Sequence, residues 1–431
     1  MSRRVLALVI LPALAGAVAA CGSPSAPAPS SPAATGAAGA TVAAPTTAAA
    51  PRPRPTGEAA GPTPRLAISH AGGVMVVDGR TLEVVGSVPT TGFVRLNPAG
   101  DGRHVLVTEG DAWRALDLGA WTEAHGDHGH SYTTDPAFTG TSFAGSHPGH
   151  VVVHGNRTVL FADGTGEIQV LDPGKLAATT TAASPAAPPV VRHRTPQAHH
   201  GVALVLPDAT LVHSLGDDTA RTGAVALDAS GREIARTDTC PGLHGEAVAA
   251  HDAVTLGCED GILVYRDRAF RKVASPDDYG RIGNQAGSEE SPVVLGDYKV
   301  DRDAELERPT RISLTDTATG RLRLVDLGAS YSFRSLERGP AGEALVLGTD
   351  GRLRVIDPAS GATTRSMPVV EPWSEPLEWQ DPRPAVRVVG DRVFVTDPAS
   401  SGLVRVDLAT GRVAERARLP HVPNEIAGVQ G

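Results

Sequence analysis

The sequence has little cysteine and no long basic tract, and both absences limit what the protein can do. There are 3 cysteines, and the formal net charge is −9. A chain without clustered Lys and Arg is a poor binder of nucleic acid, so we exclude that class of partner. No apolar run is long enough to span a bilayer, and no amphipathic helix pattern is found. There is also no convincing nucleophile constellation, since Ser146 and Ser288 have no distinctive context.

The first residues have the form of a secretory signal. Arg3 and Arg4 precede an apolar stretch at 5–18, and small residues follow. This pattern predicts a signal peptide at 1–20. Residues 18–21, Val-Ala-Ala-Cys, resemble the bacterial lipobox, which predicts that Cys21 is lipidated; an ordinary signal with an incidental cysteine is the alternative. We expect an extracytoplasmic protein that is lipid-anchored to the outer face of the cell membrane and touches it only through the anchor.

Two segments follow the signal. Residues 21–63 are almost wholly Ala, Pro, Ser, Thr and Gly, a composition that predicts a disordered tether. Residues 64–431 are expected to fold. They contain the two remaining cysteines, Cys240 and Cys258, which outside the cytoplasm most often form a disulfide. Free thiols and metal ligation are the alternatives.

Beyond residue 65 the chain consists of short alternating apolar runs between turn residues, which is typical of an all-β fold. Similar units recur about every 45–55 residues, the period of a β-propeller with four-stranded blades. An eighth unit is divided between residues 66–86, which offer two strands, and 419–429. We therefore expect seven or eight blades, with eight preferred; a solenoid of the same period is the alternative. The turns after the first strands are placed near Asp101, Asn156, Asp208, Asp252, Asp297, Ala341 and Asp391.

Histidines concentrate where three consecutive units begin. In a propeller, the connections into the innermost strands share one face with the turns between second and third strands. The stretch 123–132, EAHGDHGHSY, precedes the first of these units, and we place it in a loop on that face, able to fold over the channel opening. Imidazole and carboxylate are ligands that Zn²⁺ prefers, about four at a time. The candidate zinc ligands are His125, Asp127, His128, His130, His147, His150, His199, His200 and His244.

Other readings of these residues remain open. Each single histidine has an alternative role as a structural hydrogen bonder between blades. Asp163, Asp260 and Asp350 are interpreted as turn formers rather than ligands. Glu246 is either a carboxylate that orients a neighbouring imidazole or a solvated charge. Surface or core positions are expected for His70, His104, His154, His193, His213, His251 and His421.

Several stretches together resemble the AztD-type zinc metallochaperones. They are 118–121 (LGAW), 125–130 (HGDHGH), 148–152 (PGHVV), 200–201 (HG) and 240–246 (CPGLHGE). The resemblance spans most of the chain after residue 65. It implies an extracytoplasmic β-propeller that hands zinc to the solute-binding protein of a zinc ABC transporter. It also implies metal binding by the histidines of both clusters.

We therefore predict a monomeric zinc-binding metallochaperone, with Zn²⁺ as the bound ion and that solute-binding protein as its partner. The lipobox and tether favour transfer between two membrane-tethered proteins. We predict no enzymatic activity; a propeller hydrolase or lactonase with a channel metal is one alternative. A surface interaction module without a metal role is the other. Because zinc binds neutral imidazole, its affinity is expected to fall as the pH drops through about 6.5.

Overall fold

The computed structural model describes residues 56–176 and 188–431. The predicted signal peptide, the lipidated Cys21 and residues 22–55 of the predicted tether lie outside the described residues. The first strand, β1 (Thr56–Ala59), begins ahead of the predicted domain boundary at residue 64. A short 3₁₀ helix, η1, spans Ala250–Asp252. No helix in the described ranges is long and apolar enough to cross a membrane.

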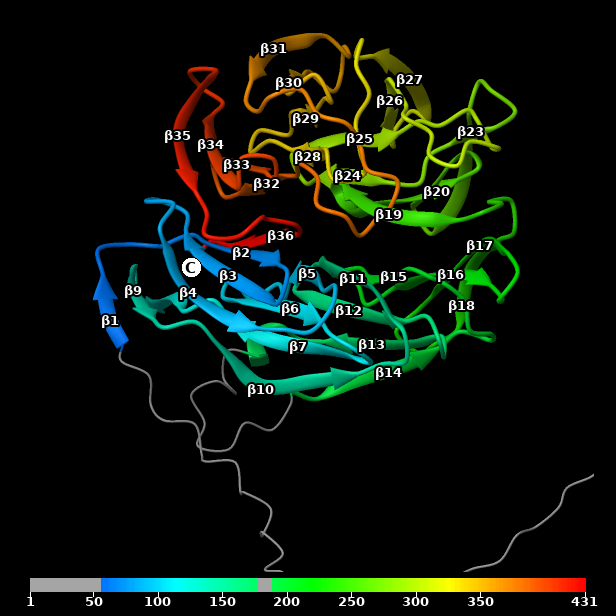
Figure 1. Ribbon diagram of the computed structural model, residues 1–431. Helices are drawn as coiled ribbons and strands as arrows, with labels where there is room; N and C mark the ends of the chain where they lie inside the picture. The colour runs from blue at the N-terminus through cyan, green and yellow to red at the C-terminus, as the bar shows by residue number, and fades with distance from the viewer. Residues whose placement is uncertain (1–55, 177–187) are drawn as a thin grey trace, which may run out of the picture. The chain divides into compact units, whose positions relative to one another are not determined.

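Most of the strands form antiparallel sheets that are all built in the same way (Figure 1). Four strands pair side by side in chain order, from an innermost strand near the middle of the ring to an outermost one. The first of these sheets contains β5 (Arg95–Pro98), β6 (His104–Thr108), β7 (Ala112–Asp117) and β10 (Ala137–Ala144). The next contains β11 (Pro148–His154), β12 (Arg157–Ala162), β13 (Glu167–Leu171) and β14 (Val190–Arg194).

The following sheets repeat this order. One contains β15 (Ala203–Val205), β16 (Leu211–Gly216), β17 (Arg221–Leu227) and β18 (Glu233–Thr237). The next contains β19 (His244–Ala249), β20 (Ala253–Cys258), β21 (Asp260–Arg266) and β22 (Ala269–Ala274), with β23 (Gly280–Arg281) added beside β21. Then come β24 (Gln285–Ser288), β25 (Ser291–Asp297), β26 (Arg311–Asp316) and β27 (Arg321–Asp326).

Two more sheets complete the series before the chain ends. One contains β28 (Leu336–Arg338), β29 (Ala344–Leu347), β30 (Arg352–Ile356) and β31 (Thr363–Pro368). The other contains β32 (Val386–Val389), β33 (Arg392–Asp397), β34 (Gly402–Asp407) and β35 (Arg412–Arg418).

The last sheet joins the two ends of the folded chain. Strand β36 (Ile426–Val429) pairs antiparallel with β2 (Arg65–His70), with Leu66 opposite Gly428. Strands β3 (Gly73–Asp78) and β4 (Val84–Pro89) complete this sheet, so the front of the chain supplies three strands rather than the predicted two. The predicted pairing between the chain ends is therefore present.

Apolar clusters join each sheet to the next around a closed circuit. For example, Val76 of β3 packs in one cluster with Val105 of β6, and Leu403 of β34 packs in another with Leu66 of β2. Further clusters bridge the remaining neighbouring pairs of sheets. Alternating strands bury one apolar face against each neighbour, which stabilises the ring. The predicted β-propeller is confirmed and an open solenoid is excluded, while the preference for eight blades stays a prediction.

One predicted turn was misplaced. Asp297 does not lie in a turn after an innermost strand but ends β25, the second strand of its sheet. Its carboxylate is 5% exposed and accepts hydrogen bonds from the backbone N–H groups of Gly283 and Asn284. The turn that corresponds to the others lies at 289–290, between β24 and β25. An aspartate that satisfies buried backbone donors has the same sequence signature as one that forms a turn.

Candidate metal centre

Three imidazoles from three consecutive sheets converge at one place. His150 lies in β11, His200 lies in the connection into β15, and His244 is the first residue of β19. Their ring centroids are 5.3 Å (His150–His200), 5.5 Å (His150–His244) and 5.1 Å (His200–His244) apart. One nitrogen from each ring can be chosen so that all three lie within 4.8 Å of one another. This spacing suits a single ion bound by three imidazoles.

Irregularities in the strands aim two of these side chains. The pairing of β11 with β12 shifts register between Pro148 and Val151, so that His150 lies in the shift. The pairing of β19 with β20 shifts between His244 and Glu246. At the second shift Gly245 has a φ of +73°, and a Cβ there would lie 2.5 Å from the carbonyl oxygen of Gly283. Bulges of this kind redirect side chains, and this one requires glycine.

In each ring, Nδ1 lies close to an oxygen atom, through a hydrogen bond in two rings and an ion-pair contact in the third. His200 Nδ1 lies 2.6 Å from Asp163 Oδ2, and His244 Nδ1 lies 2.7 Å from the carbonyl oxygen of Gly283. His150 Nδ1 lies 3.0 Å from Glu246 Oε2. An acceptor at Nδ1 fixes the ring orientation and the tautomer of a metal-binding histidine. Nε2 is therefore the nitrogen that each imidazole can offer to a metal.

The acid–base properties of two of the rings differ. Burial lowers the pKa of His150, but the charge of Glu246 and its hydrogen bond outweigh burial, and the pKa is raised. The pKa of His244 is held well below its usual value by burial and by the nearby His150. His244 is therefore neutral and ready to bind a cation at neutral pH. A cation that binds at His150 must displace a proton below the raised pKa of that ring.

The structure separates the predicted ligands that share this face. His199, next to His200, lies outside the group: its Nδ1 is 3.0 Å from the carbonyl oxygen of Gln197, and its Nε2 is 2.8 Å from Ser214 Oγ. Both ring nitrogens are thus used, and the ring is 4% exposed. His147 has a φ of +49° and lies beside Ser146, also outside the group.

Two carboxylates have more definite roles than the sequence predicted. Asp163 lies in the turn between β12 and β13, but its carboxylate contacts His200 and accepts the backbone N–H of Gly201. Its interpretation as a turn former alone is incomplete. For Glu246, of the two readings left open, the contact with His150 favours orientation of an imidazole. The carbonyl oxygen of Gly283 accepts a hydrogen bond from His244. This contact could not have been predicted from the sequence, because any residue can supply a backbone acceptor.

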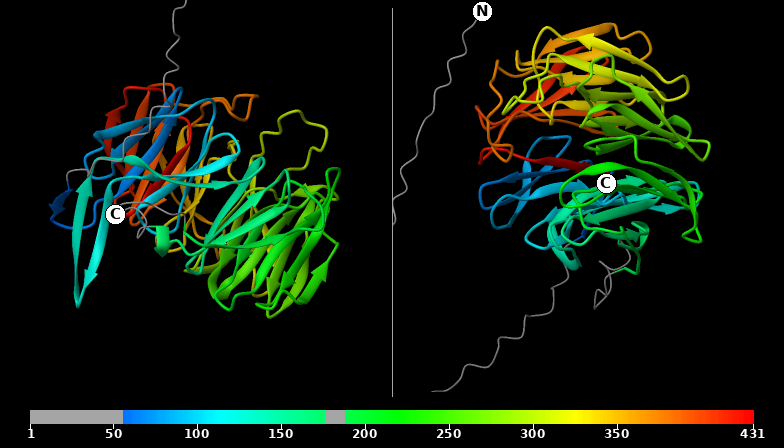
Figure 2. Two further views of the ribbon diagram at one scale, coloured as in Figure 1. Left: turned by 90° about the horizontal axis from the view of Figure 1, so that it is seen from below. Right: turned by 90° about the vertical axis from the view of Figure 1, so that its right-hand side faces the viewer.

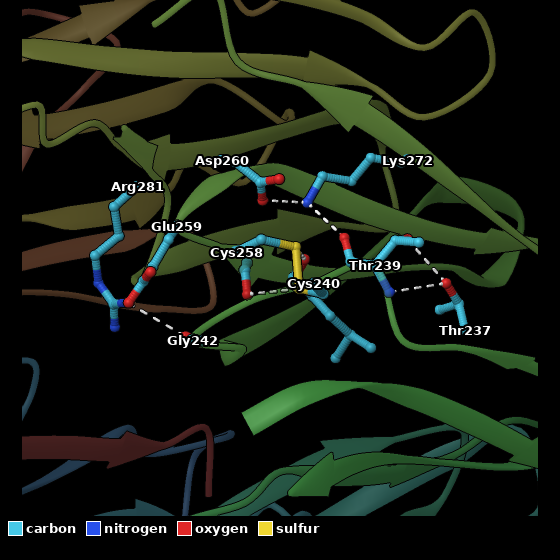
Figure 3. Close-up of a disulfide and its surroundings, with 11 residues drawn as sticks. Thr237, Thr239, Cys240, Gly242, Cys258, Glu259, Asp260, Lys272 and Arg281 are labelled. Carbon is cyan, nitrogen blue, oxygen red and sulfur yellow. Dashed lines mark hydrogen bonds and ion pairs between the residues drawn. A yellow bond between two sulfur atoms is a disulfide. The ribbon is translucent and has the colours of Figure 1, made fainter. Parts of the chain in front are cut away.

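The disulfide joins the segment that precedes His244 to the strand that pairs with it. Cys240 and Cys258 are bonded to each other, so free thiols and metal ligation are excluded for this pair (Figure 3). Cys240 precedes β19 and Cys258 ends β20, and His244 is paired with the neighbouring Gly257. The bond therefore anchors the segment that carries His244 to the second strand of the same sheet.

A second group of imidazoles lies in a hairpin. Strand β8 (Ala120–His125) pairs with β9 (His128–Thr134), and β1 adds to the other side of β9. The rings of His125, His128 and His130 have centroids 5.0–5.5 Å apart, and their ligand atoms also lie within 4.8 Å of one another. His128 Nδ1 is 3.2 Å from Asp127 Oδ1. This group is accessible to solvent and could hold a second ion.

His130 has a partner that the sequence analysis missed. Its Nδ1 lies 3.4 Å from Glu58 Oε1, and Glu58 belongs to β1. The segment was assigned to the tether because it has no apolar face. Edge strands are held by backbone hydrogen bonds, so composition carried no signal for it.

The predicted place of the His-rich stretch was wrong. It is a hairpin with Gly126 and Asp127 at the turn, and it interrupts one sheet between its third strand, β7, and its fourth, β10. Connections from third to fourth strands lie on the face opposite His150, His200 and His244. Figure 2 (left) shows the cyan hairpin and the yellow-green loop between β25 and β26 extending on opposite sides. The hairpin thus does not fold over the three-histidine group. A two-residue loop that begins with Gly is a hairpin signal that was overlooked.

The chain is similar to proteins whose structures are known. It is 26% identical over 373 residues to Zinc chaperone AztD of Citrobacter koseri, an alignment that covers 83% of this chain and 84% of that protein. The crystal structure of Citrobacter koseri AztD matches with a TM-score of 0.73 at 24% identity, covering 86% of this chain and 99% of that chain. The resemblance to AztD-type proteins is confirmed.

Other comparisons support the fold. The structure of apo AztD from Citrobacter koseri matches with a TM-score of 0.71 at 24% identity, covering 86% of this chain and 98% of that chain. Dihydro-heme d1 dehydrogenase NirN matches with a TM-score of 0.52 at 14% identity, covering 85% and 75% of the two chains. No protein-family model matches the sequence.

Proposed function

We propose that this protein is an extracytoplasmic metallochaperone that binds zinc and delivers it to the solute-binding protein of a zinc ABC transporter. The observation that carries this proposal is the convergence of His150, His200 and His244, each with Nδ1 within 3.0 Å of an oxygen atom. Neutral imidazoles oriented in this way are typical of zinc ligation. The similarity to a protein named Zinc chaperone supports the same assignment.

The donor set also suits release. Three imidazoles leave one tetrahedral position of zinc free, so that a ligand of a second protein can bind the ion before the first ligands let go. His200 is exposed at this rim, which gives an incoming ligand access. Transfer of this kind keeps the ion bound throughout.

Zinc binding is tested by metal analysis of the untagged protein and by titration against a competing chelator. The wild type is expected to hold zinc at both histidine groups. A variant with His244→Ala is expected to lose the zinc ion bound with His150 and His200. His193→Ala, which alters a histidine outside both groups, serves as the matched control. Wild-type protein that holds no zinc would overturn the proposal.

The contribution of the hairpin is tested separately by changing its three histidines to alanine. The expected result is the loss of one zinc ion per chain, with the ion at His150, His200 and His244 retained. Equal zinc content in the variant and the wild type would exclude a hairpin site. The residues to change are His125, His128 and His130.

Delivery is tested by mixing the zinc-loaded protein with the apo solute-binding protein. A chelator that captures free zinc but does not strip the loaded protein is included. Zinc that reaches the partner despite the chelator has passed by direct contact. If the chelator abolishes transfer, the zinc has passed through solution, and direct delivery is refuted while zinc binding stands.

The location is also part of the proposal. The Cys240–Cys258 disulfide is typical of proteins outside the reducing cytoplasm. Incorporation of labelled palmitate into the wild type, and its absence from Cys21→Ala, would establish the lipid anchor. A released, unlabelled wild type would show that the signal is an ordinary one.

A metal-dependent hydrolase is the second candidate, because an open fourth position on zinc also suits a catalytic water. The groove beside His200 has a volume of about 460 Å³ and is lined mainly by charged and hydroxylated side chains, including Asp217, Asp218 and Arg221. Such a lining suits a polar substrate. Zinc-dependent turnover of ester or lactone substrates that disappears in His244→Ala would favour this candidate.

A further inference from the structure

The connections into the innermost strands carry exposed apolar side chains on the same face as the three-histidine group. We call this the site face. His150 and His244 lie near the starts of β11 and β19, and His200 lies in the connection into β15; the other connections of this kind lie around the same rim. Among them are 90–94, leading into β5, 369–385, leading into β32, and 419–425, leading into β36.

Four residues of these connections form what we call the rim patch: Phe93, Leu377, Trp379 and Val422. Leu377 is 60% exposed, Trp379 is 49% exposed and Val422 is 46% exposed. Phe93 and Trp379 pack edge to face, with their ring centroids 5.1 Å apart. A half-exposed Trp beside an exposed Leu is unusual on a protein surface and is typical of residues that dominate interfaces.

The rim patch is held in place by polar contacts, one of which is a buried ion pair. Arg383 and Glu375 are paired at 2.8 Å, and both side chains are less than 5% exposed. Arg383 also donates to the carbonyl oxygen of Glu378. Asn424 donates to the carbonyl oxygen of Gln380, which ties the connection into β36 to the one into β32. A patch that is ordered in advance loses little conformational entropy on binding.

Arg95, the first residue of β5, joins connections that carry the rim patch. Its guanidinium lies 5.8 Å from the ring of Trp379 and 3.3 Å from the carboxylate of Glu425. Arg95 therefore ties Trp379 and the connection into β36 to the start of β5, on the site face.

The charges around the patch indicate what kind of surface it fits. Arg308 donates to the carbonyl oxygen of Glu375, so that the connection 298–310 lies beside 369–385. The exposed charges of these two connections are mainly acidic, with Arg302 and Arg308 as the exposed cations of the first. The exposed acids are Asp301, Asp303, Glu305, Glu371, Glu378 and Asp381.

We propose that the rim patch is the docking surface for the protein that receives zinc from His150, His200 and His244, and that this partner presents an apolar pocket with a basic border. The inference rests on the proposed function. An apolar centre with a mainly acidic border supplies affinity at the centre and orientation at the border. Docking here brings the partner onto the face where the metal is held.

The test uses full-length protein loaded with zinc and the apo solute-binding protein of the zinc transporter. Trp379→Ala and Leu377→Ser are compared with Val191→Ser, an equally exposed apolar residue of the outer strand β14. Zinc content is measured first, because it must be unchanged in all three. The transfer rate is then expected to fall at least about tenfold in Trp379→Ala and to remain at the wild-type level in Val191→Ser. Trp379→Phe is expected to recover most of the rate.

Each outcome is decisive. Transfer at the wild-type rate by zinc-loaded Trp379→Ala would overturn the docking surface while leaving the proposed function standing. A wild type that binds zinc but transfers none would remove the proposed function and this inference together. A wild-type dimer that becomes monomeric in Trp379→Ala, measured by light scattering, would assign the patch to self-association and overturn the inference. A transfer rate that does not fall as salt is raised would exclude the basic border.

Discussion

Replacing Glu246 by Gln tests whether a carboxylate beside His150 tunes the zinc site. Glu246 Oε2 lies 3.0 Å from His150 Nδ1, and the two side chains are 14% and 22% exposed. Gln keeps the size and an oxygen acceptor but removes the charge. Loss of such a partner of a metal-binding imidazole costs about 10–100-fold in affinity, or about 1.4–2.7 kcal/mol. We expect zinc affinity at pH 8 to fall by this factor.

The pH dependence gives a second, independent readout of the same change. In the wild type the pKa of His150 is raised, because Glu246 outweighs the lowering effect of burial. Below that pKa a proton competes with zinc, so wild-type affinity begins to decline above pH 6.5. Without the charge of Glu246, burial lowers the pKa of His150 with less opposition. The decline in Glu246→Gln is therefore expected to begin at a lower pH than in the wild type.

The assay is competition with a chromophoric chelator from pH 5.5 to 8.5 at constant ionic strength. Glu289→Gln is the matched control, since Glu289 carries the same charge and lines the same 360 Å³ cavity as Glu246. Glu246→Asp, which keeps the charge, is expected to retain the wild-type pH profile. If Glu246→Gln binds zinc with wild-type affinity and the same pH profile, the reasoning about this carboxylate is refuted.

Three further predictions concern stability. Burial lowers the pKa of His213 to about 4, so the unfolded chain binds a proton before the folded chain does as the pH falls. The free energy of unfolding is therefore expected to drop by about 3 kcal/mol between pH 6.5 and 4. In His213→Asn, urea unfolding should show a smaller dependence of this free energy on pH. Changing Cys240 and Cys258 to Ala opens a loop with a sequence separation of 18 and is expected to cost about 3 kcal/mol, read from the urea midpoint; an unchanged midpoint would contradict it. Arg383→Leu leaves the carboxylate of Glu375 buried without its partner and should cost about 3–5 kcal/mol by thermal unfolding, whereas the double change with Glu375→Leu should recover most of it.

The fold was predictable because its signals are local and repeated. Alternating apolar residues and regularly spaced turns indicate strands one unit at a time, and the repeat then implies the ring. The misplacement of Asp297 shows the limit of this approach. Its side chain satisfies backbone donors of a neighbouring segment, a role that residue type alone cannot distinguish from a turn.

The hairpin at 120–134 was missed for a different reason. Its histidines have the pattern of metal ligands, and the same residues also form two strands that flank the Gly126-Asp127 turn. As a result it was placed on the wrong face. The repeat does not locate an insertion, because an insertion can follow any strand of a sheet.

The amino-acid sequence alone determined which imidazoles could reach a common ion, because their positions relative to the repeat are a property of the chain. Only the tertiary structure selected His150, His200 and His244 and turned His199 inward to Ser214. The reason is that the orientation of each ring depends on bulges and on acceptors from other parts of the chain. Neither the carboxylate of Asp163 nor the carbonyl group of Gly283 is close in sequence to the ring that it holds.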